Sequence, residues 1–187
     1  MSINTDENLI RNYRKGDEKS FEILIQKYLK PLYNFVYHYV GNYDDAQEVV
    51  QEVFTRVWKY SKKFNAEKSF KTWIYAIAKN AALDFLKKKK ALPFSAFEDE
   101  KGENIIFNTL ADPDPLPLEI LERKDLAREL SQAVQQLPLP YREVILLHYN
   151  GQFTFQEISQ TLREPLNTIK SRHRRALIRL REILAPK

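Results

Sequence analysis

The sequence predicts an all-α protein made of two small helical domains, joined by an acidic linker that contains several prolines. Only four of the 187 residues are glycine, and long stretches repeat apolar residues at the three-and-four spacing of helices, without the alternating β-branched runs typical of strands. Prolines interrupt this periodicity in one central stretch. We expect domains over residues 1–90 and 119–187, the second a helix-turn-helix domain, with the linker over 91–118.

The N-terminal domain is expected to contain three long helices. Apolar periodicity predicts them over residues 21–40, 44–60 and 70–90. The middle helix carries a wide apolar stripe, and we expect Asp44 or Asp45 to cap its first turn. The opposite face is formed by acids and amides, namely Gln47, Glu48, Gln51 and Glu52. This pattern fits an ordinary amphipathic helix, and it equally suits a basic protein partner.

The helix over residues 70–90 combines aromatic and basic side chains. Its expected core side consists of Phe70, Trp73, Ile74, Ile77, Ala81 and Phe85, and its opposite side of Thr72, Tyr75, Lys79 and Leu83. Rings among lysines can stack with unpaired bases while the lysines neutralise phosphates. Phe64, in the preceding loop, and Tyr75 are the aromatics most expected at the surface. The other rings are expected in the core, and Lys87–Lys90 also fits a solvated helix end.

A helix-turn-helix is predicted near the C-terminus. Thr154 and Glu157 have the spacing of a capping box, which begins a helix that runs to about Leu162. Residues 163–165 supply the turn, because proline disfavours helical geometry at the residue before it and suits the first turn of a new helix. The second helix therefore starts near residues 166–167. An earlier helix is expected from residue 141 to a C-terminal cap at Gly151.

The second helix of this motif has one packed and one cationic face. The packed face consists of Ile169, His173, Ala176, Leu177, Leu180, Ile183 and Leu184. Ser171, Arg174 and Arg175 point the other way, flanked by Lys170 and Arg181. A basic stripe on the second helix of a helix-turn-helix indicates contact with phosphates and bases, although a solvated surface helix is the simpler alternative.

Charge is distributed unevenly along the chain, whose net charge is +5. Residues 56–90 carry +9 and residues 166–187 carry +6, whereas residues 91–125 carry −6. Two basic blocks on either side of an acidic stretch indicate two nucleic-acid contact modules on a tether.

Composition excludes several classes of protein. The chain has no cysteine, which removes disulfides and thiolate chemistry and fits the reducing cytoplasm. The polar start is not a secretory signal, and no apolar run reaches the roughly 20 residues of a membrane span, so we expect a cytoplasmic protein without membrane insertion. His38, His148 and His173 are far apart, and no phosphate loop, metal spacing or nucleophile motif occurs. We therefore expect no catalytic residue, metal or cofactor.

Three segments together resemble the extracytoplasmic-function (ECF) group of bacterial RNA polymerase sigma factors. Residues 44–54, DDAQEVVQEVF, are similar to the family's core-polymerase-binding helix. Residues 70–80, FKTWIYAIAKN, are similar to its −10 promoter element reader, and residues 168–176, TIKSRHRRA, to its −35 recognition helix. The resemblance covers nearly the whole chain outside the linker, and the three motifs occur in the family's order.

The resemblance implies a transcription initiation factor that binds core RNA polymerase, recognises and melts the −10 region and docks on the −35 region of promoter DNA. It implies polymerase contacts through Asp45, Gln47, Glu48, Gln51 and Glu52. It implies −10 contacts through Phe64, Tyr75, Ile77, Lys79, Asn80, Lys87 and Lys88. It implies −35 contacts through Thr168, Lys170, Ser171, Arg172, Arg174 and Arg175. An anti-sigma factor is a further expected partner.

Two alternatives and one departure accompany this interpretation. The alternative function is a stand-alone helix-turn-helix transcriptional regulator, which would use the same C-terminal motif without touching polymerase. Within the sigma-factor interpretation, the acidic linker would serve either as a plain tether or as a mimic of nucleic acid in the polymerase channel. The family usually has glycine where this chain has Arg163 and Asn167. Asparagine tolerates left-handed geometry or caps a helix, whereas Arg163 is expected to strain the turn.

Overall fold

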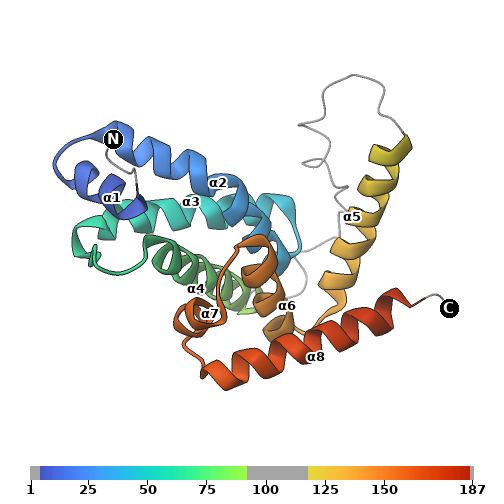
Figure 1. Cartoon of the computed structure of the whole chain (residues 1–187). Helices are drawn as coiled ribbons and strands as arrows, with labels where there is room; N and C mark the ends of the chain where they lie inside the picture. Colours follow the sequence, from blue (N-terminus) through green and yellow to red (C-terminus); the bar gives the residue numbers. More distant parts are fainter. Residues whose placement is uncertain (1–4, 92–117, 186–187) are drawn as a thin grey trace.

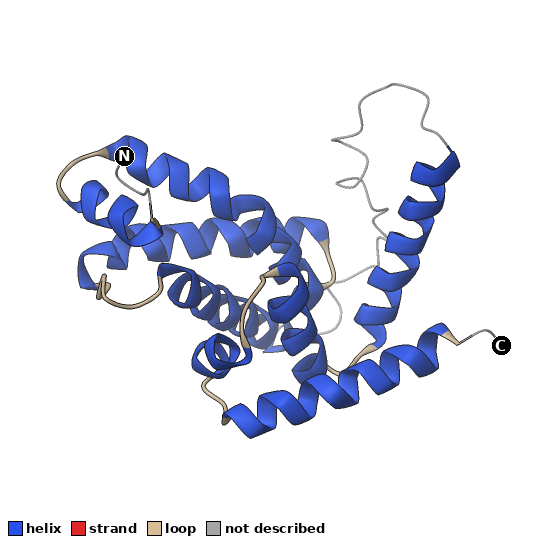
Figure 2. Ribbon diagram, viewed as in Figure 1, coloured by secondary structure: helices blue, strands red, loops and turns tan. Residues whose placement is uncertain are grey.

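The computed structural model describes residues 5–91 and 118–185, with side chains placed for 5–89 and 126–185. Every regular element in that part of the chain is helical, which confirms the predicted all-α class (Figures 1 and 2). The helices form an N-terminal bundle, α1 to α4, and a C-terminal bundle, α5 to α8. The predicted linker lies almost entirely at residues 92–117, outside the described residues.

The N-terminal bundle contains the three predicted long helices and a short one before them. The bounds are α1 Asp6–Arg14, α2 Glu18–Val40, α3 Tyr43–Tyr60 and α4 Phe70–Ala91, with a 3-10 turn, η1, at Ser61–Lys63. Gly41 ends α2 in the left-handed conformation, with φ 76°. The cap of α3 is Asn42, whose Oδ1 accepts from the Asp44 N–H at 2.9 Å. The expected cap at Asp44 or Asp45 is therefore wrong, because both already lie in the first helical turn.

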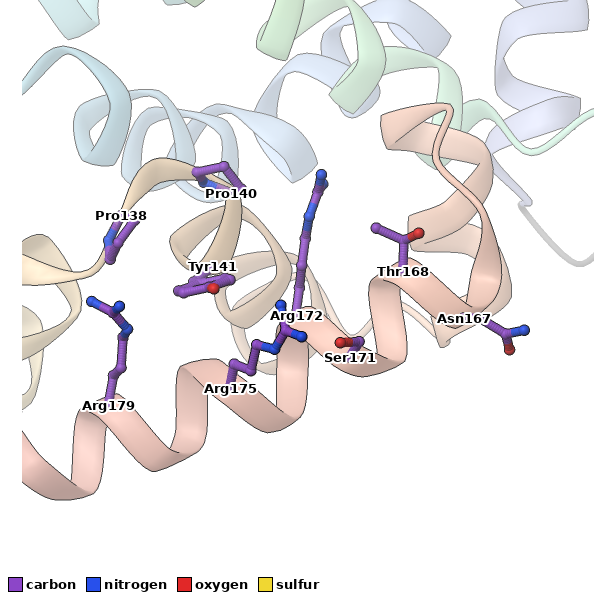
Figure 3. A pocket seen from close by; sticks show the side chains of 9 residues that line it. All are labelled: Pro138, Pro140, Tyr141, Asn167, Thr168, Ser171, Arg172, Arg175 and Arg179. Carbon is purple, nitrogen blue, oxygen red and sulfur yellow. The ribbon is translucent and has the colours of Figure 1, made fainter.

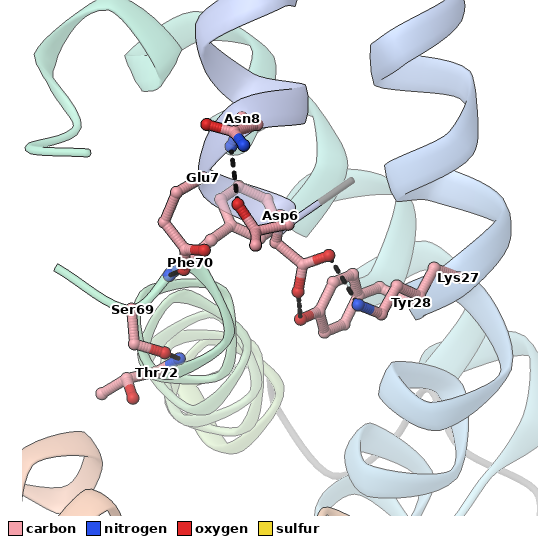
Figure 4. Close-up of polar contacts among 9 residues, drawn as sticks. Asp6, Glu7, Asn8, Lys27, Tyr28, Ser69, Phe70 and Thr72 are labelled. Atoms are coloured by element: carbon pink, nitrogen blue, oxygen red, sulfur yellow. Dashed lines mark hydrogen bonds and ion pairs between the residues drawn. The ribbon is translucent and has the colours of Figure 1, made fainter. Parts of the chain in front are cut away.

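Helix α1 holds α2 and α4 together through two neighbouring carboxylates (Figure 4). Glu7 Oε1 accepts from the backbone N–H of Phe70 at 3.0 Å, so α1 caps the first turn of α4. Asp6 accepts from the Tyr28 hydroxyl at 2.5 Å and from Lys27 Nζ at 2.6 Å. Burial, together with Asp6, raises the pKa of Tyr28, which keeps its proton as the donor.

The C-terminal bundle contains the predicted helix-turn-helix. The bounds are α5 Leu118–Gln136, α6 Leu139–Ile145 with a π-helical turn η3 at Leu146–Asn150, α7 Phe155–Leu162 and α8 Leu166–Leu184. The capping box of α7 is complete, because the Glu157 N–H donates to Thr154 Oγ1 at 3.2 Å and the Thr154 N–H to Glu157 Oε2 at 2.7 Å.

Gly151 follows η3 for a different reason from the one expected. Its φ is −82°, so it is not a left-handed cap. A Cβ at this position would lie 2.7 Å from the ring of Phe153 and 2.8 Å from the carbonyl oxygen of Leu147. Glycine is required here because the chain folds tightly back on itself.

The turn between α7 and α8 contains the expected strain. Arg163 is left-handed, with φ 56° and ψ 45°, a conformation that costs a side-chain-bearing residue about 1–2 kcal/mol. Ser159 Oγ donates to the Glu164 carbonyl at 2.6 Å, and Arg172 pairs with Glu164 at 3.1 Å. Asn167 lies inside α8, so its expected use as a cap or left-handed residue is wrong.

The two bundles pack against each other at two places. Near the start of α4, the ring of Tyr75 lies edge-on to that of Phe153, with centres 5.0 Å apart, and α4 runs beside α7 (Figure 1). At the end of α2, the Tyr39 hydroxyl donates to Glu143 Oε1 at 2.6 Å. Arg142 donates to the carbonyl of the neighbouring His38.

His38 makes the stability of the molecule depend on pH. Burial, and next the positive charge of Arg142, lower the pKa of His38 from 6.5 to about 4. The neutral ring is therefore favoured in the folded state, and its stability contribution is present above pH 6.5 and lost as pH falls through about 4. The free energy of unfolding should fall by about 3 kcal/mol over that range. Chemical denaturation measured between pH 7.5 and 4 should show a shallower fall in His38→Gln; equal falls would contradict this assignment.

Arg163→Gly is expected to raise the free energy of unfolding by about 0.5–1 kcal/mol. Glycine removes about 1–2 kcal/mol of left-handed strain from the folded state. It also increases the conformational entropy of the unfolded chain, which lowers the free energy of unfolding by about 0.5–1 kcal/mol. Arg174→Gly, on an exposed position of α8, is the matched control and should instead cost about 1 kcal/mol. Urea denaturation compares the two, and a loss of stability in both would show that the turn is not strained.

Candidate nucleic-acid interface

The acid-amide face of α3 is exposed as its pattern suggests. Gln47, Glu48, Gln51 and Glu52 are all exposed. Asp45 is half-buried and pairs with Lys89 of α4 at 2.7 Å. The predicted polymerase contacts are thus brought together on one helix face, with Asp45 at its edge.

A groove of about 690 Å³ runs between this face and α4. Glu48, Gln51 and Glu52 line one wall, and Asp84 and Lys88 line the other. Arg56 crosses the groove, bonded to Glu52 at 2.7 Å and to Asp84 at 3.4 Å. Because Glu48 and Lys88 line the same groove, the predicted polymerase face and the predicted −10 face are contiguous.

Phe64 is part of the core, and the surface position expected for it is wrong. It is 5% exposed, and its ring lies 4.7 Å from the ring of Trp73 and 5.7 Å from that of Phe70. Two arginines of α1 hold its loop from outside, because Arg14 donates to the Phe64 carbonyl and Arg11 to the Ala66 carbonyl. Sequence alone does not reveal these long-range contacts.

Tyr75 is also buried, at 4% exposure, so its expected surface position is wrong as well. It packs against Phe153 of the C-terminal bundle, and burial raises its pKa to about 12. Lys79, on the same side of α4, donates to the Leu162 carbonyl at 3.4 Å. The expected division of α4 into a core side and a free side therefore fails, because its buried arc extends to include Tyr75, Ala78 and Ala82.

The remaining predicted −10 residues share the other side of α4. By helical periodicity, Ile77, Asn80, Lys87 and Lys88 lie along one stripe. Asn80, Lys87 and Lys88 are exposed, and Ile77 is half-buried. Trp73 lies on this stripe too and is half-buried against Phe64. This stripe presents an amide and two ammonium groups beside an apolar surface, which suits a base edge flanked by phosphates.

The predicted −35 residues lie along α8. Lys170, Arg174 and Arg175 are exposed, while Thr168 and Ser171 are half-buried. Arg172 is also half-buried and is paired with Glu164 across the turn. Arg172 therefore stabilises the turn, and the exposed cations Lys170, Arg174 and Arg175 lie on either side of Arg172 along α8.

A basic groove of about 670 Å³ lies beside α8 and brings in residues that the motif did not single out (Figure 3). Pro138, Pro140 and Tyr141 of the α6 start form one wall, and Arg175 and Arg179 extend from the other. The Arg179 guanidinium lies 5.6 Å from the Tyr141 ring centre. The sequence could have indicated Arg179 as part of this surface, because it lies one helical turn after Arg175 and continues the cationic face.

The packed face predicted for α8 is correct except at Leu177. Ile169, Ala176 and Leu180 are buried. His173 packs among aromatic side chains, 3.2 Å from the Tyr149 hydroxyl and 5.0 Å from the Phe155 ring. Leu177 is 41% exposed because it borders an apolar groove of about 410 Å³ between the two bundles.

The described residues contain neither the arrangement of a metal site nor a membrane-spanning helix. Among them, no group of three or more histidine or carboxylate side chains has the arrangement of a metal site. Nor does any of their helices combine the length and apolar character needed to cross a membrane.

Comparison with known proteins matches both bundles to one family. The Sigma-70 region 2 family matches residues 24–92, and the Sigma-70 region 4 family matches residues 127–180. The ECF RNA polymerase sigma factor SigW of Bacillus subtilis is 30% identical over 94% of each chain. The ECF RNA polymerase sigma-E factor of Escherichia coli K12 is 28% identical over 92% of this chain and 90% of its own.

Two solved structures share the fold. CnrH, in complex with the cytosolic domain of CnrY, has a TM-score of 0.68 at 20% identity and 96% coverage of both chains. RpoE of Bartonella quintana, in complex with the anti-sigma factor NepR, has a TM-score of 0.70 at 22% identity, covering 89% of this chain and 97% of its own.

With the acid-amide helix α3, the exposed stripe of α4 and the helix-turn-helix in this order along the chain, these matches define a sigma-70-type initiation factor. The chain belongs to the ECF RNA polymerase sigma factors. It is a transcription initiation factor that directs RNA polymerase to promoters, and the stand-alone regulator is not favoured.

Because Phe64 is buried and Asn80 is exposed, alanine substitutions at the two positions should change the free energy of unfolding by different amounts. Phe64→Ala should lower the free energy of unfolding by about 3–5 kcal/mol, because it empties a site between Trp73 and Phe70. Asn80→Ala, at an exposed position of the same surface region, should change stability by less than about 0.5 kcal/mol. Urea denaturation measures both. If Phe64→Ala left the free energy of unfolding unchanged, the Phe64 ring of the wild-type chain would have to lie at the surface.

Proposed function

We propose that residues 1–90 bind core RNA polymerase and the −10 element, that residues 119–187 bind the −35 element, and that residues 91–118 link them. The observation that carries this assignment is the presence of three exposed polar surfaces, on α3, α4 and α8, within the two segments matched by the sigma families.

The polymerase contact is assigned to Asp45, Gln47, Glu48, Gln51 and Glu52. Four of these side chains are exposed on one face of α3. Carboxylates and amides at an exposed helix face suit a partner surface that carries basic side chains, since complementary charge steers association and fixes register. The buried face of the same helix anchors it in the bundle, so the exposed face is held rigidly.

The −10 contact is assigned to the stripe of Ile77, Asn80, Lys87 and Lys88 on α4. The Asn80 amide can pair with the edge of an unstacked base, and the lysines with the strand that carries it. Phe64 supports this stripe from below through Trp73. Tyr75 and Lys79, which face the C-terminal bundle, join the DNA surface only when α7 moves away from α4.

The −35 contact is assigned to α8 and the groove beside it. Lys170, Arg174 and Arg175 are exposed, with Ser171 between them, and this face suits entry into a major groove. An arginine that forms two hydrogen bonds with guanine contributes about 1–3 kcal/mol of discrimination. Arg179 and Tyr141 extend the same surface and suit phosphate contact, which positions α8 without reading sequence.

The partners and setting follow from the same assignment. Core RNA polymerase, promoter DNA and an anti-sigma factor are the proposed partners, the last supported by the anti-sigma partner named in the Bartonella quintana structure. The proposed location is the cytoplasm, where polymerase acts, and the chain itself is not proposed to catalyse a reaction or to require a metal or cofactor.

Run-off transcription with bacterial core polymerase tests the proposal. The wild-type chain should co-elute with core polymerase and yield promoter-specific transcripts. Glu48→Lys with Glu52→Lys should abolish co-elution and reduce transcripts at least about tenfold, because like charges are brought against a basic partner surface.

A matched charge reversal and a DNA-face variant complete the experiment. Glu18→Lys with Glu22→Lys reverses two exposed acids at the same spacing on α2 and should leave transcription unchanged. Arg174→Ala with Arg175→Ala should keep co-elution and lose −35-dependent transcripts. If the wild-type chain bound DNA but neither co-eluted nor produced transcripts on any template, it would be a stand-alone regulator.

A further inference from the structure

Helix α1 carries none of the polymerase or DNA contacts assigned above. It lies before residue 24, where the match to the Sigma-70 region 2 family begins. Three of its side chains, Glu7, Arg11 and Arg14, have the four-and-three spacing that places them on one helix face. Each of them bonds to the backbone of the same segment, residues 61–70, which connects α3 to α4. We call these three residues the clasp.

Arg14 holds the first part of this segment. The segment begins with the 3-10 turn η1, and the last carbonyls of a helix need donors from elsewhere. Arg14 Nε donates to the Ser61 carbonyl at 2.7 Å, and Arg14 Nη2 donates to the carbonyls of Ser61 and Phe64. Ser61 is only 3% exposed, so its carbonyl depends on protein donors. One guanidinium group therefore ties together two carbonyls three positions apart.

Arg11 and Glu7 hold the middle and the end of the segment. Arg11 Nη2 donates to the Ala66 carbonyl at 3.1 Å. Glu7 Oε1 accepts from the Phe70 N–H at 3.0 Å, where α4 begins (Figure 4). The path of the segment is thus set at its start, its middle and its end by side chains of one helix.

Phe64 and Trp73 connect the clasp to the proposed −10 surface. Arg14 holds the backbone of Phe64, and the Phe64 ring packs 4.7 Å from the ring of Trp73. Trp73 lies on the same stripe of α4 as Ile77 and Asn80. A shift of the segment therefore moves the ring that supports this stripe. Groups that bind a ligand have to be held within about 0.5 Å of the productive geometry by the residues that support them.

We propose that the clasp positions the −10 reading surface, because Glu7, Arg11 and Arg14 fix the path of residues 61–70 and this path sets the place of the α4 stripe against an unpaired promoter strand. The three residues are positioning residues, since they act on DNA only through the segment and Trp73. The proposal rests on the −10 role assigned above to α4. It gives α1 a part in promoter recognition without any contact between α1 and DNA.

Arg14→Lys is the decisive variant. It keeps the positive charge and replaces the rigid fork of donors by a single ammonium group. Holoenzyme assembled from core polymerase and this variant should bind a labelled non-template-strand oligonucleotide about tenfold more weakly than wild-type holoenzyme. The oligonucleotide carries the −10 sequence of a promoter that the wild-type chain transcribes. The preference for it over an oligonucleotide with scrambled −10 bases should also fall, while co-elution with core polymerase stays unchanged.

Arg11 supplies a second pair of variants that does not disturb the core, because Arg11 is exposed. Arg11→Ala removes the bond to the Ala66 carbonyl and should weaken binding of the same oligonucleotide about threefold. Arg11→Lys keeps one donor and should restore most of this loss. Lys15→Gln is the matched control, since it removes an exposed cation next to Arg14 in the chain, and it should bind as wild type does.

Tryptophan fluorescence of the free chain reports the position of the segment. The chain has two tryptophans, and Trp58, which is 60% exposed, can be replaced by phenylalanine. The remaining Trp73 packs against Phe64. In this Trp58→Phe background, Arg14→Lys should shift the Trp73 emission to longer wavelength, because the loosened segment admits water to the ring, while circular dichroism stays unchanged. Lys15→Gln should leave the emission in place.

Either of two results would overturn the proposal. The first is unchanged oligonucleotide binding and base preference in Arg14→Lys and Arg11→Ala, even with a lower free energy of unfolding, because the clasp would then only support the bundle. The second is an unchanged Trp73 emission in Arg14→Lys. Failure of the proposed function is distinguishable from both, because it would appear as a lack of −10 binding by the wild-type holoenzyme itself, and the role of the clasp would fall with it.

Discussion

The packing of α4 over a wide arc of its surface is the constraint on which the rest of the molecule depends. Phe70 and Ile74 are fully buried in the N-terminal bundle, where Glu7 caps the helix start. Ala78 and Ala82 are also fully buried, and their small side chains let neighbouring helices approach closely. Tyr75 continues the buried arc toward α7. One helix therefore sets the position of both bundles and leaves a single stripe available for contact with another molecule.

Features encoded by neighbouring residues were predictable from the sequence, and those that depend on distant residues were not. The capping box of α7 needs only Thr154 and Glu157, three positions apart, so its prediction is confirmed. The period of α4 identifies an apolar face, but it cannot indicate that Phe153, far along the chain, covers Tyr75. Phe64 stands in a loop without periodicity, and the side chain that bonds its carbonyl, Arg14, comes from the distant helix α1.

The candidate site shows the same division. The exposed faces of α3 and α8 follow from helical periodicity, because one apolar stripe determines which side chains must point outward. The ion pairs within those faces do not follow from it. Asp45 is bound to Lys89 and Arg172 to Glu164, so two charged members of the motifs hold neighbouring elements in place. A motif indicates which residues are near a surface, whereas the structure shows which of their charges are already engaged.

The pairing of Tyr75 with Phe153 also limits how the halves of such a chain can be exchanged. If the C-terminal bundle of a relative were grafted onto this N-terminal bundle, the recognition helix would bring its own DNA preference with it. The ring that meets Tyr75 and the acid that meets Tyr39 would have to be present in the graft as well. Modularity in promoter choice is therefore bounded by a pair of side-chain contacts outside the recognition helix, and a successful chimera must inherit them together with α8.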